Sequence, residues 1–129
     1  MAITIEKSEF VTCTCETSIT KEDFIRAYDE AIGSPEFAPG DPILFDFRTA
    51  SLLGLSYDDC AAIAKHEQSR RVERGAGRCA LTVGQDADYG VSRMLQALRD
   101  CNMDESQVSV FRNLDEAKTW LATTRADQD

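Results

Sequence analysis

Tyr89-Gly90-Val91-Ser92-Arg93-Met94 joins a short apolar stretch to an amphipathic helix, and this junction decides the fold. The stretch before it, residues 79–83, reads Cys-Ala-Leu-Thr-Val and predicts a strand. The chain closes in the same order, with a strand over 108–111 and a helix that Asn113 caps. Two strand–helix units in succession indicate a small α/β module. The apolar inner face predicted for the first of these helices consists of Val91, Met94, Leu95, Leu98 and Cys101.

The earlier sequence alternates in the same way. Ile3 and Ile5 predict a first strand, and residues 11–15 alternate Val or Cys with Thr, as in a half-buried second strand. Residues 43–45 are apolar on both faces, which is typical of a central strand. Helix one is predicted from its cap at Thr20, with Phe24, Ala27, Tyr28, Ala31 and Ile32 buried. Helix two is predicted from its cap at Ser56 toward Arg74, with Tyr57, Cys60, Ala61, Ile63 and Ala64 inside.

This order predicts one α/β domain with a mixed, mostly parallel sheet of four to five strands and about four helices. A single domain also suits a length of 129 residues. We expect the domain to span residues 1–122 and to be followed by a polar, frayed tail over 123–129.

Composition narrows the function classes. With 14 basic and 23 acidic side chains, the net charge is -9, which argues against a nucleic-acid or anionic-membrane binder. The sequence has no signal peptide pattern and no apolar run of the ~20 residues needed to cross a bilayer, so we expect a cytoplasmic protein without membrane insertion. Its five cysteines are then expected to be free thiols.

From Asp41 to Leu121, the chain resembles the SpoIIAA-like family, also described as STAS/SEC14-like domains. Four segments carry the resemblance: Phe45-Asp46-Phe47-Arg48, the strand over 78–83, the Tyr89–Met94 helix entry, and the closing Val110-Phe111-Arg112 with Asp115-Glu116-Ala117 and Trp120-Leu121. The resemblance implies a four- or five-stranded sheet with helices packed on it. It also implies a non-catalytic role, because the anti-sigma-factor antagonist STAS domains bind partner proteins and are switched by serine phosphorylation.

The switched serine of those domains begins the helix after the central strand, which implies Ser56 here, with Ser51 as a second phosphoacceptor to check. Gly54-Leu55-Ser56 stands where those domains have Asp-Ser-Ser-Gly. Asp58 and Asp59 follow in the first turn, where their charges would oppose a phosphate dianion. The residues themselves therefore favour Ser56 as an ordinary helix cap.

Two loops are expected to form a recognition edge, because ligands of open α/β sheets bind at the carboxyl ends of strands. These loops are Arg48–Ser56 and Gly84–Arg93. Asp86 and Asp88 would repel phosphate unless Arg93 points back toward them. The residues expected to contact a ligand or partner are Arg48, Leu52, Leu53, Leu55, Asp86, Tyr89 and Arg93.

Other candidate chemistry has a simpler interpretation. Cys13 and Cys15 share a strand face, but buried packing explains them better than a metal site, for which we expect no ligand set. His66 is the single histidine, and no nucleophile pattern accompanies it, so we expect a helix-surface histidine. The cluster Arg70, Arg71, Arg74 and Arg78 suits an anion patch or, more simply, a basic helix end with Glu67 and Glu73 at pairing distance.

We therefore expect a non-catalytic regulatory or protein-interaction module that requires no cofactor. The alternative is a binder of a small apolar or lipid-like ligand between helices and sheet, in a cavity lined by Phe24, Tyr28 and Tyr57. A dense core at that place would argue against the alternative. An uncovered edge strand would make a homodimer plausible.

Overall fold

The computed structural model of the chain describes residues 3–7, 10–101 and 107–127. Five strands form one sheet in the order β1-β2-β3-β4-β5, in which β1 runs antiparallel to β2 and the other pairs are parallel. This is the predicted mixed, mostly parallel sheet. The strands are Ile3–Lys7 (β1), Val11–Ser18 (β2), Ile43–Ser51 (β3), Arg78–Val83 (β4) and Gln107–Phe111 (β5).

The helices follow the strands along the chain, as predicted, with one short addition. Helix two ends at Ser69 because Arg70 leaves the helical conformation, and a separate turn then runs to Arg74. The last helix continues to Asp127, beyond the boundary expected at residue 122, and residues 128–129 of the expected tail lie outside the described residues. The helices are Lys21–Ile32 (α1), Tyr57–Ser69 (α2), Arg71–Arg74 (α3), Asp86–Cys101 (α4) and Leu114–Asp127 (α5).

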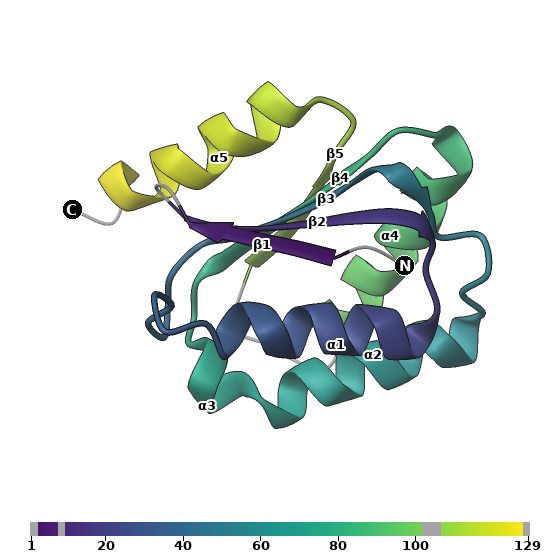
Figure 1. Ribbon diagram of the computed structural model, residues 1–129, viewed down its shortest axis with the longest axis horizontal. Coiled ribbons are helices and arrows are strands. Elements are labelled where there is room, and N and C mark those ends of the chain that lie inside the picture. Colours follow the sequence, from purple (N-terminus) through teal and green to yellow (C-terminus); the bar gives the residue numbers. More distant parts are fainter. Residues whose placement is uncertain (1–2, 8–9, 102–106, 128–129) are drawn as a thin grey trace.

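The sheet separates two layers of helices, with α1, α2 and α4 on one face and α5 on the other (Figure 1). Ile43, Phe45 and Phe47 of β3 point to the first face, where they join the main core. Leu44 lies on the second face with Ala117 and Leu121 of α5. Burying each large apolar side chain contributes about 1.5–3 kcal/mol. The predicted buried face of α1 is confirmed, residue for residue.

β3 extends further than predicted. A register shift between Thr14 and Glu16 of β2 lets the ladder continue, so that Ser18 pairs with Ser51. Thr17 has a φ of 66°, which is strained for a β-branched residue. Arg48 and Ser51, expected in a loop, are therefore strand residues, and only a short turn separates β3 from α2.

None of the described helices has the length and apolar content needed to cross a bilayer.

Candidate functional site

The carboxyl ends of the parallel strands lie at one edge of the sheet, where three helices of the main-core face begin and α5 begins on the other face. β2 leads into α1, β3 into α2 and β4 into α4, so all three helices begin at the same edge, on the right in Figure 1. The two segments predicted to form a recognition edge therefore lie at the carboxyl ends of adjacent parallel strands, and we call this the recognition edge.

A hollow of about 550 Å³ lies at this edge. Both predicted loops contribute to it, the first through Ser51 and Leu53 and the second through Asp86 and Asp88. The lining residues that lie outside both predicted loops and were missed are Thr17 and Ser18. Other lining residues lie within the loops but were not among the expected contact residues: Thr49, Ala50, Gln85, Ala87 and Asp88. Most of the polar groups are hydroxyls from strand ends. The register shift in β2 brings the end of that strand to the hollow, and no pattern in the sequence predicts this shift.

Asp88 joins the two loops. Its side chain is buried at the start of α4, and Oδ1 accepts a hydrogen bond from the backbone N–H of Leu52 at 2.8 Å. Asp86, in contrast, is exposed and forms an ion pair with Arg112 after β5. The condition under which Arg93 would offset these carboxylates, that it points back toward them, is not met by the described contacts. Its guanidinium instead lies 3.5 Å from the hydroxyl of Tyr89.

The three leucines expected at the recognition edge divide into two groups. Leu52 and Leu55 are buried in the main core, so their assignment as ligand contacts is wrong. The turn that links the Leu55 N–H to the Leu52 carbonyl directs both side chains inward. Leu53 is 63% exposed, and Tyr57, which was expected inside, is 59% exposed because it occupies the first position of α2 at the rim.

Ser56 is a helix cap. Its Oγ accepts a hydrogen bond from the Asp59 N–H, and its own N–H donates to the Asp59 carboxylate, each at 3.0 Å. The backbone hydrogen bond from Ser56 holds the pKa of Asp59 below its usual value. Ser51 is half-buried at the end of β3, where its Oγ accepts from the Leu53 N–H at 3.4 Å. Both hydroxyls thus have local structural partners.

The substitution Ser56→Ala is expected to lower the free energy of unfolding by about 1 kcal/mol, because the Asp59 N–H loses its cap. Urea denaturation followed by circular dichroism measures the change. Ser69→Ala is the matched control at the opposite end of α2, where the hydroxyl donates to the His66 carbonyl. Equal stability of Ser56→Ala and the wild type would contradict the capping role.

Arg48 faces the other side of the sheet. It forms two hydrogen bonds of 2.9 Å with Asp46, which is buried on the α5 face. Burial alone would raise the pKa of Asp46, but the hydrogen bonds from Arg48 outweigh it and hold the pKa below its usual value. The prediction that Arg48 joins the loop residues is therefore not supported, because strand alternation directs its side chain away from the core face.

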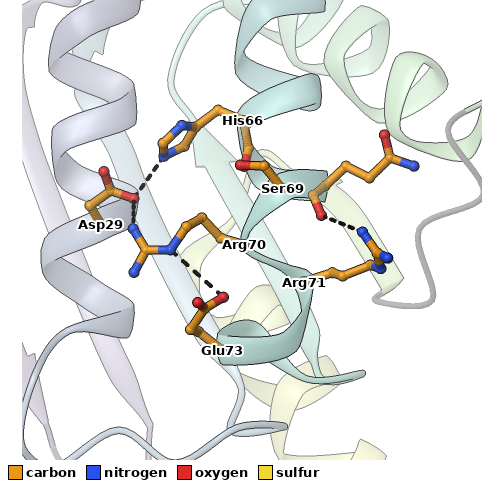
Figure 2. A network of polar contacts seen from close by, with 7 residues as sticks. Asp29, His66, Ser69, Arg70, Arg71 and Glu73 are labelled. Carbon is orange, nitrogen blue, oxygen red and sulfur yellow. Dashed lines mark hydrogen bonds and ion pairs between the residues drawn. The ribbon is translucent and has the colours of Figure 1, made fainter.

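A polar network connects α1 with the end of α2 (Figure 2). Oδ1 of Asp29 lies 2.8 Å from His66 Nε2 and 2.9 Å from Arg70 Nη1. Asp29, His66 and Ser69 are the residue types of a Ser-His-Asp hydrolase triad. However, the Ser69 hydroxyl donates to the His66 backbone carbonyl at 2.6 Å and not to the imidazole. This arrangement fixes two helices together and does not prepare a nucleophile.

The arginine cluster is divided among separate structural contacts. Arg70 binds Asp29, and Arg71 donates to the Gln68 carbonyl. Arg74 is buried, and Arg78 lies over the Trp120 ring at 4.6 Å. Three of these four guanidiniums are thus engaged by α1, by α5 or by the core, which supports the simpler interpretation over an anion patch.

The described thiols are packed in the core. Cys13, Cys15, Cys60 and Cys79 are buried and form no disulfide, and the sulfur atoms of Cys13 and Cys15 lie 3.9 Å apart. The hydrogen bond with Cys15 and the burial both raise the pKa of the Cys13 thiol. Within the described ranges, no three His, Cys, Asp or Glu side chains are grouped as metal ligands. The side chain of Cys101 lies outside the described part.

The space between α1 and the sheet is filled. Phe24 packs against Phe45 and Phe47 with ring centroids 5.7 and 5.5 Å away, and Tyr28 is buried beside them. This dense packing argues against the ligand cavity expected there. A hollow of about 580 Å³ lies instead on the opposite face, beside α5. Its lining residues are Glu6, Phe10, Thr12, Leu44, Asp46, Leu114, Lys118, Thr119 and Ala122.

Comparison with known proteins identifies the fold. No family model and no curated protein matches the chain. Among solved structures, the chain is similar to an uncharacterized protein from the DUF3478 family with a SpoIIAA-like fold, from Shewanella loihica PV-4. The TM-score is 0.57 at 18% sequence identity, over 93% of this chain and 92% of that one. The SpoIIAA-like fold predicted from the sequence is therefore confirmed.

Proposed function

We propose that this SpoIIAA-like domain is a non-catalytic module that binds a protein partner at the recognition edge. The observation that carries the proposal is the exposure of Leu53, which lines the hollow, and of Tyr57 at the start of α2. Four residues apart, their Cα atoms are within roughly 14 Å of each other. Large apolar side chains that gather at a surface mark interaction sites more often than single scattered ones. We call Leu53, Tyr57, Asp58 and Asp86 the docking surface.

A non-catalytic role is supported by the reactive side chains that the structure describes. The imidazole of His66 is held by Asp29, and the Ser69 hydroxyl is directed at a backbone carbonyl. The described cysteines are buried. General-base or nucleophilic catalysis requires these groups to face a substrate together, and they do not converge here.

Ser56 provides a means of regulation within the same proposal. It is exposed and lies between Leu53 and Tyr57 in the sequence. Phosphorylation would remove the cap on the Asp59 N–H and add a dianion next to Asp58. Loss of the cap and repulsion would both disturb the start of α2, and with it the position of Tyr57.

Selection from a phage-displayed random peptide library tests the proposal. We expect peptides that bind the wild-type domain and lose binding to the double variant Leu53→Ser/Tyr57→Ser, as measured by fluorescence polarisation with each labelled peptide. Val72→Ser is the matched control, because Val72 is 79% exposed on α3, away from the recognition edge. Peptides that bind the double variant as tightly as the wild type would contradict the docking surface.

The hollow beside α5 favours a second candidate function, the binding of a small molecule. Its volume is within the range of ligand pockets, and Leu44, Leu114 and Phe10 give it an apolar floor. Native mass spectrometry of the purified protein would show a ligand as extra mass that disappears on denaturation. Leu114→Trp is expected to fill the hollow and abolish that mass, and its persistence in this variant would exclude the hollow as the site.

A further inference from the structure

At two helix starts of the recognition edge, those of α1 and α2, one of the protein's own carboxylates accepts the N–H of the cap residue. Asp23 accepts a hydrogen bond from the Thr20 N–H at 3.1 Å in the capping box of α1. Asp59 does the same for α2, and Asp88, in the first turn of α4, takes the N–H of Leu52. Free amides at helix starts are what anionic ligands use, and here acids compete for that position.

The carboxylates of Asp23 and Asp59 stay charged. Backbone hydrogen bonds from Thr20 and Ser56 hold the pKa values of Asp23 and Asp59 below their usual range. Both acids are therefore ionised at neutral pH, and each helix start carries a negative charge that repels phosphate or another carboxylate.

The same edge has further exposed acids. Glu22 and Asp58 lie in the first turns of α1 and α2, and Asp86 is paired with Arg112. The carboxylates at the three helix starts are Glu22, Asp23, Asp58, Asp59, Asp86 and Asp88, and the nearby cations are Lys21, Arg26, Arg93 and Arg112. Carboxylates outnumber cations at this edge, in keeping with the net charge of -9.

Resting on the proposed function, we infer that the partner segment is a basic peptide that carries an apolar anchor. Its anchor packs on Leu53 and Tyr57, and its lysine or arginine side chains face Asp58 and Asp86. An arginine has an additional attraction to the exposed Tyr57 ring, because a guanidinium binds an aromatic face. An acidic or phosphorylated segment would instead place like charges against the carboxylates.

Two fluorescein-labelled probe peptides test the charge. One alternates leucine with arginine, the other alternates leucine with glutamate, and both are titrated by fluorescence polarisation. We expect the arginine probe alone to bind, with an affinity that falls as salt is raised, since salt screens exposed charges. Asp58→Asn/Asp86→Asn and Leu53→Ser/Tyr57→Ser are each expected to weaken binding at least about tenfold. Glu30→Gln/Glu73→Gln is the control, because it removes two exposed charges far from the recognition edge, in the last turn of α1 and in α3.

The outcomes separate the inference from the proposed function. Library peptides that depend on Leu53 and Tyr57 but bind Asp58→Asn/Asp86→Asn normally would overturn the basic partner and leave the module intact. Equal binding of the glutamate probe, or binding to phosphatidylserine vesicles through this surface, would do the same. If no library peptide and neither probe responds to Leu53→Ser/Tyr57→Ser, the docking surface itself is wrong.

Discussion

Replacing Arg74 with methionine is expected to lower the free energy of unfolding by about 3 kcal/mol. Removing a charged side chain from the surface would change this free energy little. Arg74 is buried, and its guanidinium donates to the carbonyls of Asp41 and Arg78 at 2.7 and 2.8 Å. It also lies 5.8 Å from the centre of the Phe37 ring. Methionine keeps most of the apolar volume but none of the donors, so both carbonyl oxygens lose a charged partner.

Urea denaturation of Arg74→Met beside Arg71→Met measures this effect. Arg71 is exposed, with a single described hydrogen bond of 3.3 Å to the Gln68 carbonyl, so its loss is expected to change stability by less than about 0.5 kcal/mol. If the two variants unfold at the same urea concentration, the hydrogen bonds of the Arg74 guanidinium do not stabilise the fold as expected.

Arg74 also holds the 34–42 loop against a turn in which Gly75 and Gly77 leave no room for a side chain. The Gly40 N–H donates to the Arg74 carbonyl at 2.8 Å. A Cβ atom added to Gly77 would lie 2.3 Å from the Gly40 oxygen, and one on Gly75, whose φ is +73°, would lie 2.2 Å from the Gly40 nitrogen. The 34–42 loop, α3 and the turn before β4 are therefore one unit, which explains why a charged side chain is retained there.

The fold could be predicted because its signals are local. The period of α1 gave its buried face, and Ser56 and Asp59 lie at capping spacing. Arg74 could not be recognised in the same way, since its partner Asp41 in the loop that buries it lies 33 residues earlier. In the sequence it is one arginine of four, and each looks equally exposed.

The recognition edge shows the same division. Its place follows from topology, because parallel strands with helical crossovers bring their carboxyl ends together. Which side chains face the hollow depends on contacts between distant segments. Leu52 and Leu53 are neighbours with opposite burial, and Asp86 and Asp88 differ in the same way. A short loop has no helical or strand period in its polar and apolar residues, so its sequence does not predict which of these side chains is buried and which is exposed.

The substitution Asp88→Ala is expected to lower the free energy of unfolding by about 2–3 kcal/mol. The carboxylate is the acceptor for the Leu52 N–H, a buried backbone group 36 positions away in the sequence. Alanine leaves that buried donor without its acceptor. Urea denaturation measures the loss, and hydrogen exchange of the Leu52 amide is expected to accelerate with it.

Two companion variants separate the hydrogen bond from the charge. Asp88→Asn retains an oxygen acceptor, so it should lose clearly less stability than Asp88→Ala. Asp86→Ala removes an exposed acid whose ion pair with Arg112 contributes roughly 0–1 kcal/mol. If Asp88→Ala behaves like Asp86→Ala, the two loops are not joined through this side chain. If it behaves as expected, Leu53 is held beside α4 by its buried neighbour Leu52, and the docking surface depends on an acid that no partner touches.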